Sequence, residues 1–248
     1  MSDINVKGIV LGGINYKEKD KILSVFTLEK GLISCKLVGA LSAKAKLKFV
    51  KEPFCFADFI LNLKNITSFN DAIYTITSAN VIESFYDLTL DYEKYVCGCA
   101  ILEIIKKVAQ KENPNELLFI ETIKALKVLT FDNIDPQLVL TKFMVSIFQA
   151  MGYALSLNKC SCCGDNFIGK RFFNYESGDI VCLSCKRPNA VEISSLLHAN
   201  LRLAHETEYE NLKNLKLKKE GLKQALNLLV NNFERRFETL ISSVNKLP

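Results

Sequence analysis

Four cysteines in two pairs are the residues of this chain whose type and spacing most clearly suggest chemistry. Each pair has the form Cys-x-x-Cys, one formed by Cys160 and Cys163 and the other by Cys182 and Cys185. A two-residue spacer lets a tight turn direct both sulfur atoms at one ion, and four thiolates complete a tetrahedral zinc shell. Because four cysteines leave no open coordination position, the spacing predicts a structural Zn²⁺ site rather than a catalytic one.

The same cysteines allow two other interpretations. A disulfide framework is disfavoured because the chain has an odd number of cysteines, nine, and the first twenty residues carry no signal-peptide pattern. A redox switch is the second alternative, since Cys160-Ser161-Cys162 is also a Cys-x-Cys, which resembles the zinc sites of redox-regulated chaperones. The role of Cys162 stays open at this point.

Basic residues gather in one short stretch although the net charge of the chain, +5, is modest. Lysines without intervening acidic residues mark a candidate nucleic-acid surface, here Lys36, Lys44, Lys46, Lys48 and Lys51. In an extended chain the alternating Lys44, Lys46 and Lys48 would point to one side. Nearby aromatic residues could stack on bases, although Phe49 is expected in a hydrophobic core. A second run, from Lys213 to Lys219, is more typical of a solvated face.

Short apolar runs separated by turn residues predict that the first part of the chain is built from strands. Five segments of this kind recur about every ten residues with turn residues between them, namely 6–11 (closed by Gly12-Gly13), 22–28, 32–38, 54–63 and 72–77. Such spacing predicts a small closed barrel, with the lysine-rich segment 42–51 between two of its strands.

From about residue 81 the apolar period becomes helical. Asn113-Pro114 and Asp135-Pro136 each have the form of a helix cap followed by proline, 92–110 forms another helix, and a long apolar stripe runs from Leu222 to Val244. The sequence therefore predicts an α+β multidomain protein, in which a β-barrel domain (1–80) precedes an α-helical domain (81–248). The four-cysteine zinc segment, 158–188, is inserted in the helical domain.

Motifs of common enzyme classes are missing from the sequence. It contains no phosphate-binding loop, no G-x-G-x-x-G, no H-E-x-x-H and no G-x-S-x-G. The two histidines, His198 and His205, are expected to be ordinary helix residues. No apolar run reaches the roughly 18 residues of a membrane span. We therefore expect a cytoplasmic protein without catalytic residues and without a membrane partner.

Several stretches of the chain resemble the bacterial recombination mediator RecO family. The specific part runs from Tyr16 to Ile33, and Gly39-Ala40, Pro53-Phe54 and Glu83-Ser84-Phe85 fall where the family has similar residues. The cysteine pairs match family members that carry zinc. The resemblance implies an amino-terminal OB-fold followed by a helical domain interrupted by a zinc segment.

The resemblance also implies a function in DNA repair. Members bind single- and double-stranded DNA, anneal complementary strands and, with RecR, help RecA displace single-stranded DNA-binding protein, in the bacterial cytoplasm at the nucleoid. That last partner would contact an apolar pocket with basic rims, for which Lys106-Lys107, Lys124 or Lys127 are candidates. Two alternatives remain, a redox-regulated holdase chaperone that uses the zinc thiols and a protein-binding adaptor without affinity for DNA. The basic segment 36–51 contains lysine only, which favours phosphate contact by point charge over bidentate binding.

Overall fold

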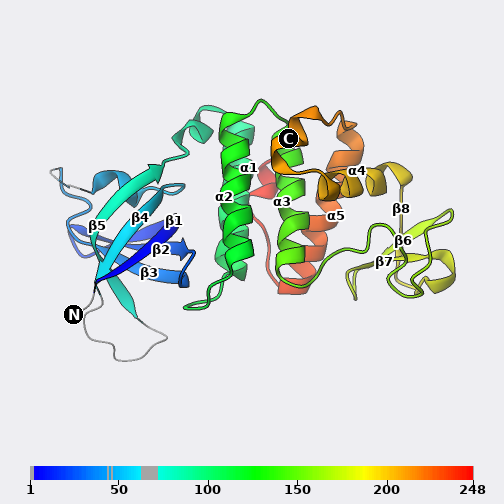
Figure 1. Ribbon diagram of the computed structural model, residues 1–248, viewed down its shortest axis with the longest axis horizontal. Coiled ribbons are helices and arrows are strands. Elements are labelled where there is room, and N and C mark those ends of the chain that lie inside the picture. Colours follow the sequence, from blue (N-terminus) through cyan, green and yellow to red (C-terminus); the bar gives the residue numbers. More distant parts are fainter. Residues whose placement is uncertain (1–2, 44, 46, 63–71, 248) are drawn as a thin grey trace. The chain divides into compact units, whose positions relative to one another are not determined.

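The chain folds into two compact units, Met1–Ile120 and Glu121–Pro248 (Figure 1). The structure is a computed structural model that describes residues 3–43, 45, 47–62 and 72–247. None of the helices in this described part of the chain combines the length and the apolar character needed to cross a bilayer.

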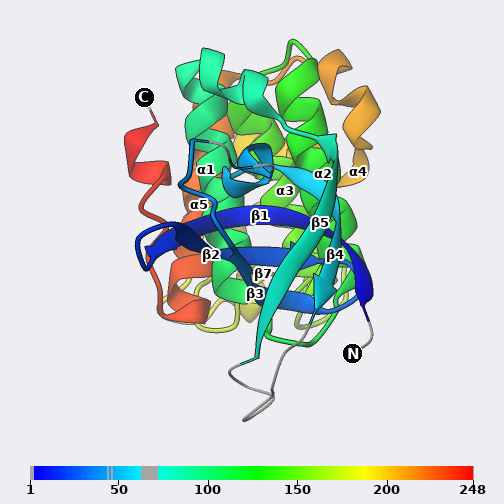
Figure 2. The same cartoon turned by 90° about the vertical axis from the view of Figure 1, so that its left-hand side faces the viewer.

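The first unit contains a closed five-stranded barrel (Figure 2). The strands follow the order β1-β2-β3-β5-β4, and the parallel pairing of Ser34–Lys36 in β3 with Ile73–Thr75 in β5 completes the circle. All other neighbouring strands are antiparallel. This topology confirms the predicted OB-fold barrel. The strand bounds are Ile4–Tyr16 (β1), Asp20–Thr27 (β2), Gly31–Leu37 (β3), Phe56–Asn62 (β4) and Ile73–Glu83 (β5).

Strand β1 continues past the residues that were expected to end it. Its register against β2 shifts between Val10 and Gly12, as in a β-bulge, and Gly12 has a φ of 143°. A residue with a side chain rarely adopts that backbone conformation, so glycine here permits the bulge. The prediction that Gly12-Gly13 terminates the strand was therefore wrong.

The helices of the chain confirm one predicted cap and correct another. The Asp135 carboxylate accepts a hydrogen bond from the Gln137 amide at 2.9 Å, with Pro136 at the first helical position, as predicted. The helix expected after Asn113 instead begins at Glu116, where the Asn115 side chain accepts from the Leu118 amide at 3.0 Å. Asn113 is therefore not the cap. The α-helices are Tyr92–Val108 (α1), Glu116–Phe131 (α2), Pro136–Ala150 (α3), Ser195–Glu206 (α4) and Lys219–Phe237 (α5).

Helices α3, α4 and α5 pack against one another in the second unit. The apolar stripe predicted from Leu222 to Val244 leaves the helix after Phe237, because Glu238 adopts a left-handed conformation with a φ of 48°. Short strands build a separate three-stranded sheet, ordered β7-β6-β8, around the cysteine pairs. These strands are Arg171–Asn174 (β6), Asp179–Cys182 (β7) and Val191–Ile193 (β8), and 3₁₀ turns cover Lys48–Lys51 (η1), Tyr86–Leu90 (η3), Leu183–Cys185 (η4), Tyr209–Asn214 (η5) and Val244–Lys246 (η6).

Gly31 provides a test of the first unit. Its φ is +67°, and a Cβ atom there would lie 2.3 Å from the Asn113 carbonyl oxygen. We expect Gly31→Ala to lower the free energy of unfolding in urea by about 3 kcal/mol, since backbone strain and a clash with backbone add. Gly39 has the same φ, but a Cβ atom there would meet no other atom within 4 Å, so Gly39→Ala should cost only about 1 kcal/mol. Equal losses for the two variants would contradict this packing.

Candidate metal centre and nucleic-acid interface

The four cysteines of the two Cys-x-x-Cys pairs lie together in the second unit. The sulfur atoms of Cys160, Cys163, Cys182 and Cys185 all lie within 4.8 Å of one another, and those of Cys163 and Cys182 are 3.9 Å apart. A tetrahedral shell with metal–sulfur bonds of about 2.3 Å requires sulfur–sulfur separations of about 3.8 Å. The group therefore fits a single metal ion. Neither histidine belongs to it.

Local backbone geometry brings the first pair into position. The Cys160 amide donates to the Asp165 carbonyl at 2.8 Å, and the Gly164 amide donates to the Cys160 carbonyl at 2.9 Å. Gly164 has a φ of 78°, which lets the chain turn back directly after Cys163. The second pair begins at the last residue of β7, from which η4 carries the chain on to Cys185.

Backbone amides favour the thiolate form at Cys160. Burial raises the pKa of this thiol, but hydrogen bonds from the amides of Cys163, Cys182 and Cys162 outweigh that effect and lower the pKa to about 6. The Cys182 amide, for example, lies 3.3 Å from the Cys160 sulfur. A deprotonated sulfur is the form that binds metal. Cys162 itself is exposed and is not one of the four clustered ligands.

Two arginines of α5 hold the segment 158–188, which contains the four cysteines, against that helix. The Arg236 guanidinium donates to the Ser177 carbonyl at 2.6 Å and lies 4.3 Å from the centre of the Tyr153 ring. Arg235 lies 5.0 Å from the ring centre of Tyr175. Ser177 and Tyr175 lie between β6 and β7, so these contacts anchor the segment independently of the four cysteines.

The predicted DNA-contacting lysines occupy different environments. Lys36 is half-buried and its ammonium lies 2.9 Å from the Asp20 carboxylate. Lys44 and Lys46 lie outside the described residues. Lys48 begins η1 and is exposed, and Lys51 ends it. The alternation argument is therefore wrong at Lys48, which lies in a 3₁₀ turn and not in an extended chain.

Phe49 was expected in the hydrophobic core, and this expectation was wrong. Phe49 is 69% exposed, while the neighbouring Val50 is buried and packs in the barrel core. Consecutive residues of a 3₁₀ turn point in different directions, so burying Val50 leaves Phe49 in solvent. The Lys48 ammonium lies 5.1 Å from the centre of the Phe49 ring. An exposed aromatic ring beside a cation is suited to contact with a nucleobase and its phosphate.

A second aromatic residue, Tyr16, lies at the end of β1 with lysines around it. The residue is 38% exposed, and the ammonium groups of Lys17 and Lys36 lie 5.5 and 5.4 Å from the centre of its ring. Lys21, on the adjacent strand, donates to the Lys51 carbonyl at 3.0 Å and so connects this hairpin to η1. We define these residues as the basic rim, namely Tyr16, Lys17, Lys21, Lys36, Lys48, Phe49 and Lys51.

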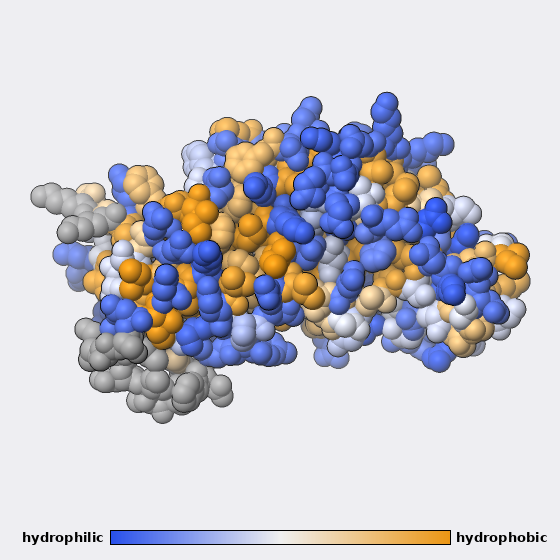
Figure 3. Space-filling view, viewed as in Figure 1, coloured by the Kyte–Doolittle hydropathy of each residue, from blue (hydrophilic) through white to orange (hydrophobic). Residues whose placement is uncertain are grey.

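Lys17 and Lys21 of the basic rim were missed from the sequence. The alternation of Lys17, Lys19 and Lys21 was available as a signal, but acidic residues between them masked the basic character of the stretch. On the face of the barrel seen in Figure 3, hydrophilic and hydrophobic residues are interleaved. The rim combines ammonium groups, which attract phosphate, with two rings on which bases can stack.

Comparison with known proteins identifies the family. The family model of the recombination protein O amino-terminal region matches residues 1–85, and that of its carboxy-terminal region matches residues 89–239. This chain belongs to the recombination protein O family. Both matches together include the barrel, the helices α1 to α5 and the four cysteines.

Curated relatives extend over nearly the whole chain. A protein of Caldicellulosiruptor saccharolyticus named DNA repair protein RecO is 27% identical, covering 94% of this chain and 92% of the relative. Proteins of the same name from Caldicellulosiruptor bescii and Clostridium perfringens are 30% and 26% identical, covering 92% and 89% of this chain and 88% and 87% of the relatives.

Substitution of Arg236 tests how the segment 158–188 is held in the second unit. We expect Arg236→Ala to lower the free energy of local opening of residues 171–182 by about 1–2 kcal/mol, because a hydrogen bond from a charged donor and a cation–π contact are lost. Amide hydrogen exchange of this stretch measures the change. Arg235→Ala, which removes only a ring contact at a more exposed site, should change it by about 0.5 kcal/mol. Unchanged protection in the Arg236 variant would contradict the anchoring role.

Proposed function

We propose that this protein acts in DNA repair as a recombination mediator. In this proposal it binds single- and double-stranded DNA, anneals complementary strands and, with RecR, helps to load RecA onto DNA covered by single-stranded DNA-binding protein. The observation that carries the proposal is the basic rim of an OB-fold barrel in a member of the recombination protein O family. Relatives named DNA repair protein RecO support the same function.

The proposed mechanism is binding, with no covalent bond made or broken. Residues 1–80 form the proposed nucleic-acid-binding domain, in which Lys36, Lys44, Lys46, Lys48 and Lys51 neutralise phosphates while Tyr16 and Phe49 stack on bases. Annealing also requires that the repulsion between two strands be reduced. The run from Lys213 to Lys219 supplies a second basic surface for that purpose in the helical domain, 81–248.

Zinc is the metal we propose for the four-cysteine centre. A shell of four thiolates, with no open position, suits structural Zn²⁺, which would close residues 158–188 around one ion. Binding of this kind contributes to folding outright, since the unfolded chain has no preformed site. The metal would therefore stabilise the segment on the helical domain without touching DNA.

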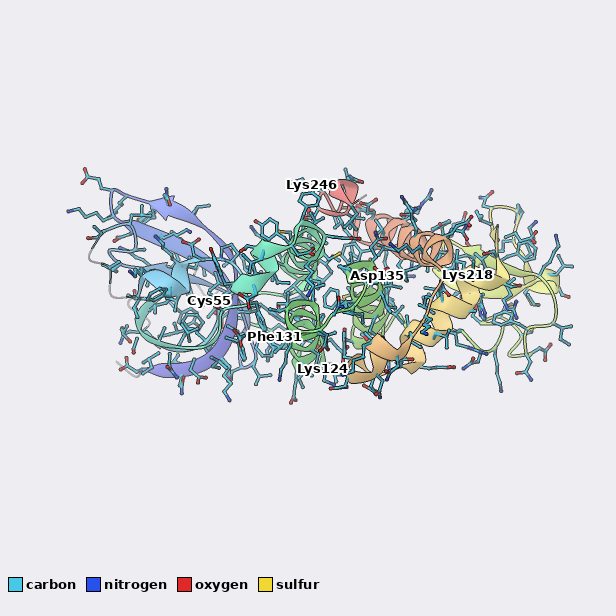
Figure 4. All side chains as sticks on the ribbon, turned by 90° about the horizontal axis from the view of Figure 1, so that it is seen from above. Cys55, Lys124, Phe131, Asp135, Lys218 and Lys246 are labelled. Atoms are coloured by element: carbon cyan, nitrogen blue, oxygen red, sulfur yellow. The ribbon has the colours of Figure 1, made fainter. Side chains whose placement is uncertain are left out.

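A pocket of about 280 Å³ in the second unit suits the single-stranded DNA-binding protein. Phe131, 53% exposed, and Val128 give it apolar walls, and lysines of α2 and η5 line it beside them. Figure 4 shows Phe131 and Lys124 of α2. Apolar walls flanked by lysines fit an acidic, apolar segment of a protein partner. The lining residues are Lys124, Lys127, Val128, Phe131, Asp132, Tyr209, Glu210 and Lys213. We therefore propose that Lys124 and Lys127, and not Lys106-Lys107, are the lysines that border the pocket.

The two alternatives receive less support. A redox-regulated holdase would rely on the Cys-x-Cys formed by Cys160 and Cys162, whereas the clustered sulfur atoms are those of the two Cys-x-x-Cys pairs. An adaptor without affinity for DNA leaves the exposed Phe49 and its neighbouring Lys48 without a role. DNA binding uses both features of the rim.

DNA binding separates into two measurable parts. We expect Phe49→Ser to weaken binding of a short single strand by about 1–3 kcal/mol without changing its salt dependence, since stacking releases no counterion. Lys48→Gln should flatten the slope of log K against log salt by about 0.7. Fluorescence anisotropy at several salt concentrations measures both quantities. Lys246→Gln, a matched loss of one charge outside the rim, is the control, and equal effects at Lys246 and Lys48 would contradict the assignment.

Metal content tests the four-cysteine centre. We expect the unsubstituted protein and Cys162→Ser to hold one zinc per chain, and Cys163→Ser to lose the metal or hold it far more weakly, because three thiolates leave the shell incomplete. A colorimetric metal assay gives the stoichiometry, and limited proteolysis should show cleavage within 158–188 in Cys163→Ser with the barrel intact. Loss of metal from the Cys162 variant instead would refute the ligand assignment.

The pocket is tested by substitutions along one helix. We expect Phe131→Ser to weaken binding of purified single-stranded DNA-binding protein about tenfold, because an exposed aromatic anchor is lost. Leu117→Ser, at an apolar residue of α2 that is 63% exposed but outside the pocket, should leave the affinity unchanged. Calorimetric titration compares the two, and the reverse ranking would place the partner elsewhere.

A further inference from the structure

The Asp20 carboxylate contacts Lys36 of the basic rim and also the turn that follows β3. One oxygen accepts a hydrogen bond from the Gly39 amide at 2.9 Å, and the other lies 2.9 Å from the Lys36 ammonium. The side chains of Asp20 and Lys36 are only 15% and 28% exposed. The pair is therefore better sheltered than a typical surface ion pair, and Asp20 also fixes the turn that follows β3.

Tyr16 connects this ion pair to the stacking surface. Tyr16 and Asp20 are cross-strand neighbours at the end of the β1–β2 hairpin, and the Lys36 ammonium that Asp20 holds lies 5.4 Å from the Tyr16 ring centre. Because Asp20 holds this cation in place, it competes with a nucleobase for the face of the ring, whereas Lys48 at Phe49 forms no ion pair with the described residues and can move aside. The charge of Lys36 is also already balanced by Asp20 before any phosphate arrives.

We infer that Asp20 is a positioning residue of the nucleic-acid site, whose carboxylate holds Lys36 on Tyr16 and releases it when a base and its phosphate bind. This inference rests on the proposed DNA binding. In the free protein the lysine is bound to Asp20. In the complex the Lys36 ammonium contacts a phosphate and a base stacks on the Tyr16 ring. Asp20 still accepts the hydrogen bond from the Gly39 amide. Asp20 thereby lowers the affinity of the rim and its dependence on salt.

The salt dependence follows from counting ions. A free lysine that binds a phosphate contributes about 0.7 to the slope on single strands, because a counterion is released from the nucleic acid. When the lysine first leaves Asp20, that carboxylate takes up a cation, and the two effects nearly cancel. The ion pair therefore hides one phosphate contact from the salt slope.

Asp20→Asn tests the inference while preserving the fold. The asparagine oxygen still accepts from the Gly39 amide, so the turn remains and only the ion pair is lost. We expect binding of a short oligothymidylate at low salt to tighten about two- to fivefold, and the slope of log K against log salt to steepen by about 0.7. In the double variant with Lys36→Gln, both gains should disappear.

Two further variants make the outcome decisive. Glu52→Gln changes the net charge in the same way as Asp20→Asn, but the Glu52 side chain is about 60% exposed and its carboxylate lies 3.9 Å from the Lys51 ammonium. The salt slope of the Glu52 variant should therefore match that of the unsubstituted protein. Lys36→Gln alone should also leave the slope unchanged, and a decrease of about 0.7 would overturn the inference even if Asp20→Asn failed to fold. Equal slopes for Asp20→Asn and the unsubstituted protein, or gains that persist in the double variant, would overturn it too. No binding by the unsubstituted protein would instead refute the proposed function, and the inference with it.

Discussion

Parallel pairing between β3 and β5 closes the barrel, and the basic rim depends on that closure. The paired residues are Ser34–Lys36 and Ile73–Thr75, so Lys36 is itself part of the closing contact. The closed barrel has a continuous core, in which Val50 of η1 packs with residues of the strands. Burial of Val50 forces the adjacent Lys48 and Phe49 outward. The chemistry of the rim is thus a consequence of how the core is filled, and a polar loop without Val50 would not present the ring in this way.

The metal centre obeys a different constraint. The short strands β6, β7 and β8 bury only a small apolar cluster, in which Phe172, Val181 and Ala190 pack with Cys160. The four clustered sulfur atoms, which could hold a metal ion, and the guanidinium of Arg236 add to this small core. The barrel is held by burial and backbone pairing, whereas in our proposal the segment depends on metal ligation and a few polar contacts as well as on its small core. Loss of a bound metal should consequently loosen the segment and leave the barrel folded.

Features set by neighbouring residues could be predicted from the sequence, and features set by tertiary contacts could not. The hairpin of β2 and β3 and the cap at Asp135 follow from local patterns, and both appear as expected. The spacing of the cysteines likewise suffices to predict their gathering at one point. The bulge at Gly12 and the exposure of Phe49 depend on the partner strand and on the core. The contact between Asp20 and Lys36 depends on the β2–β3 register, which no single residue type reveals.

Photo-crosslinking tests most directly whether the basic rim holds nucleic acid. A single strand that carries 5-iodouracil is irradiated with the metal-loaded protein, and the attached peptides are mapped by mass spectrometry. Stacked aromatic rings react readily with this base, so our account predicts attachment at Tyr16 and Phe49. The adduct at position 49 should be lost in Phe49→Leu. Attachment confined to the helical domain, with none between residues 16 and 51, would contradict the account.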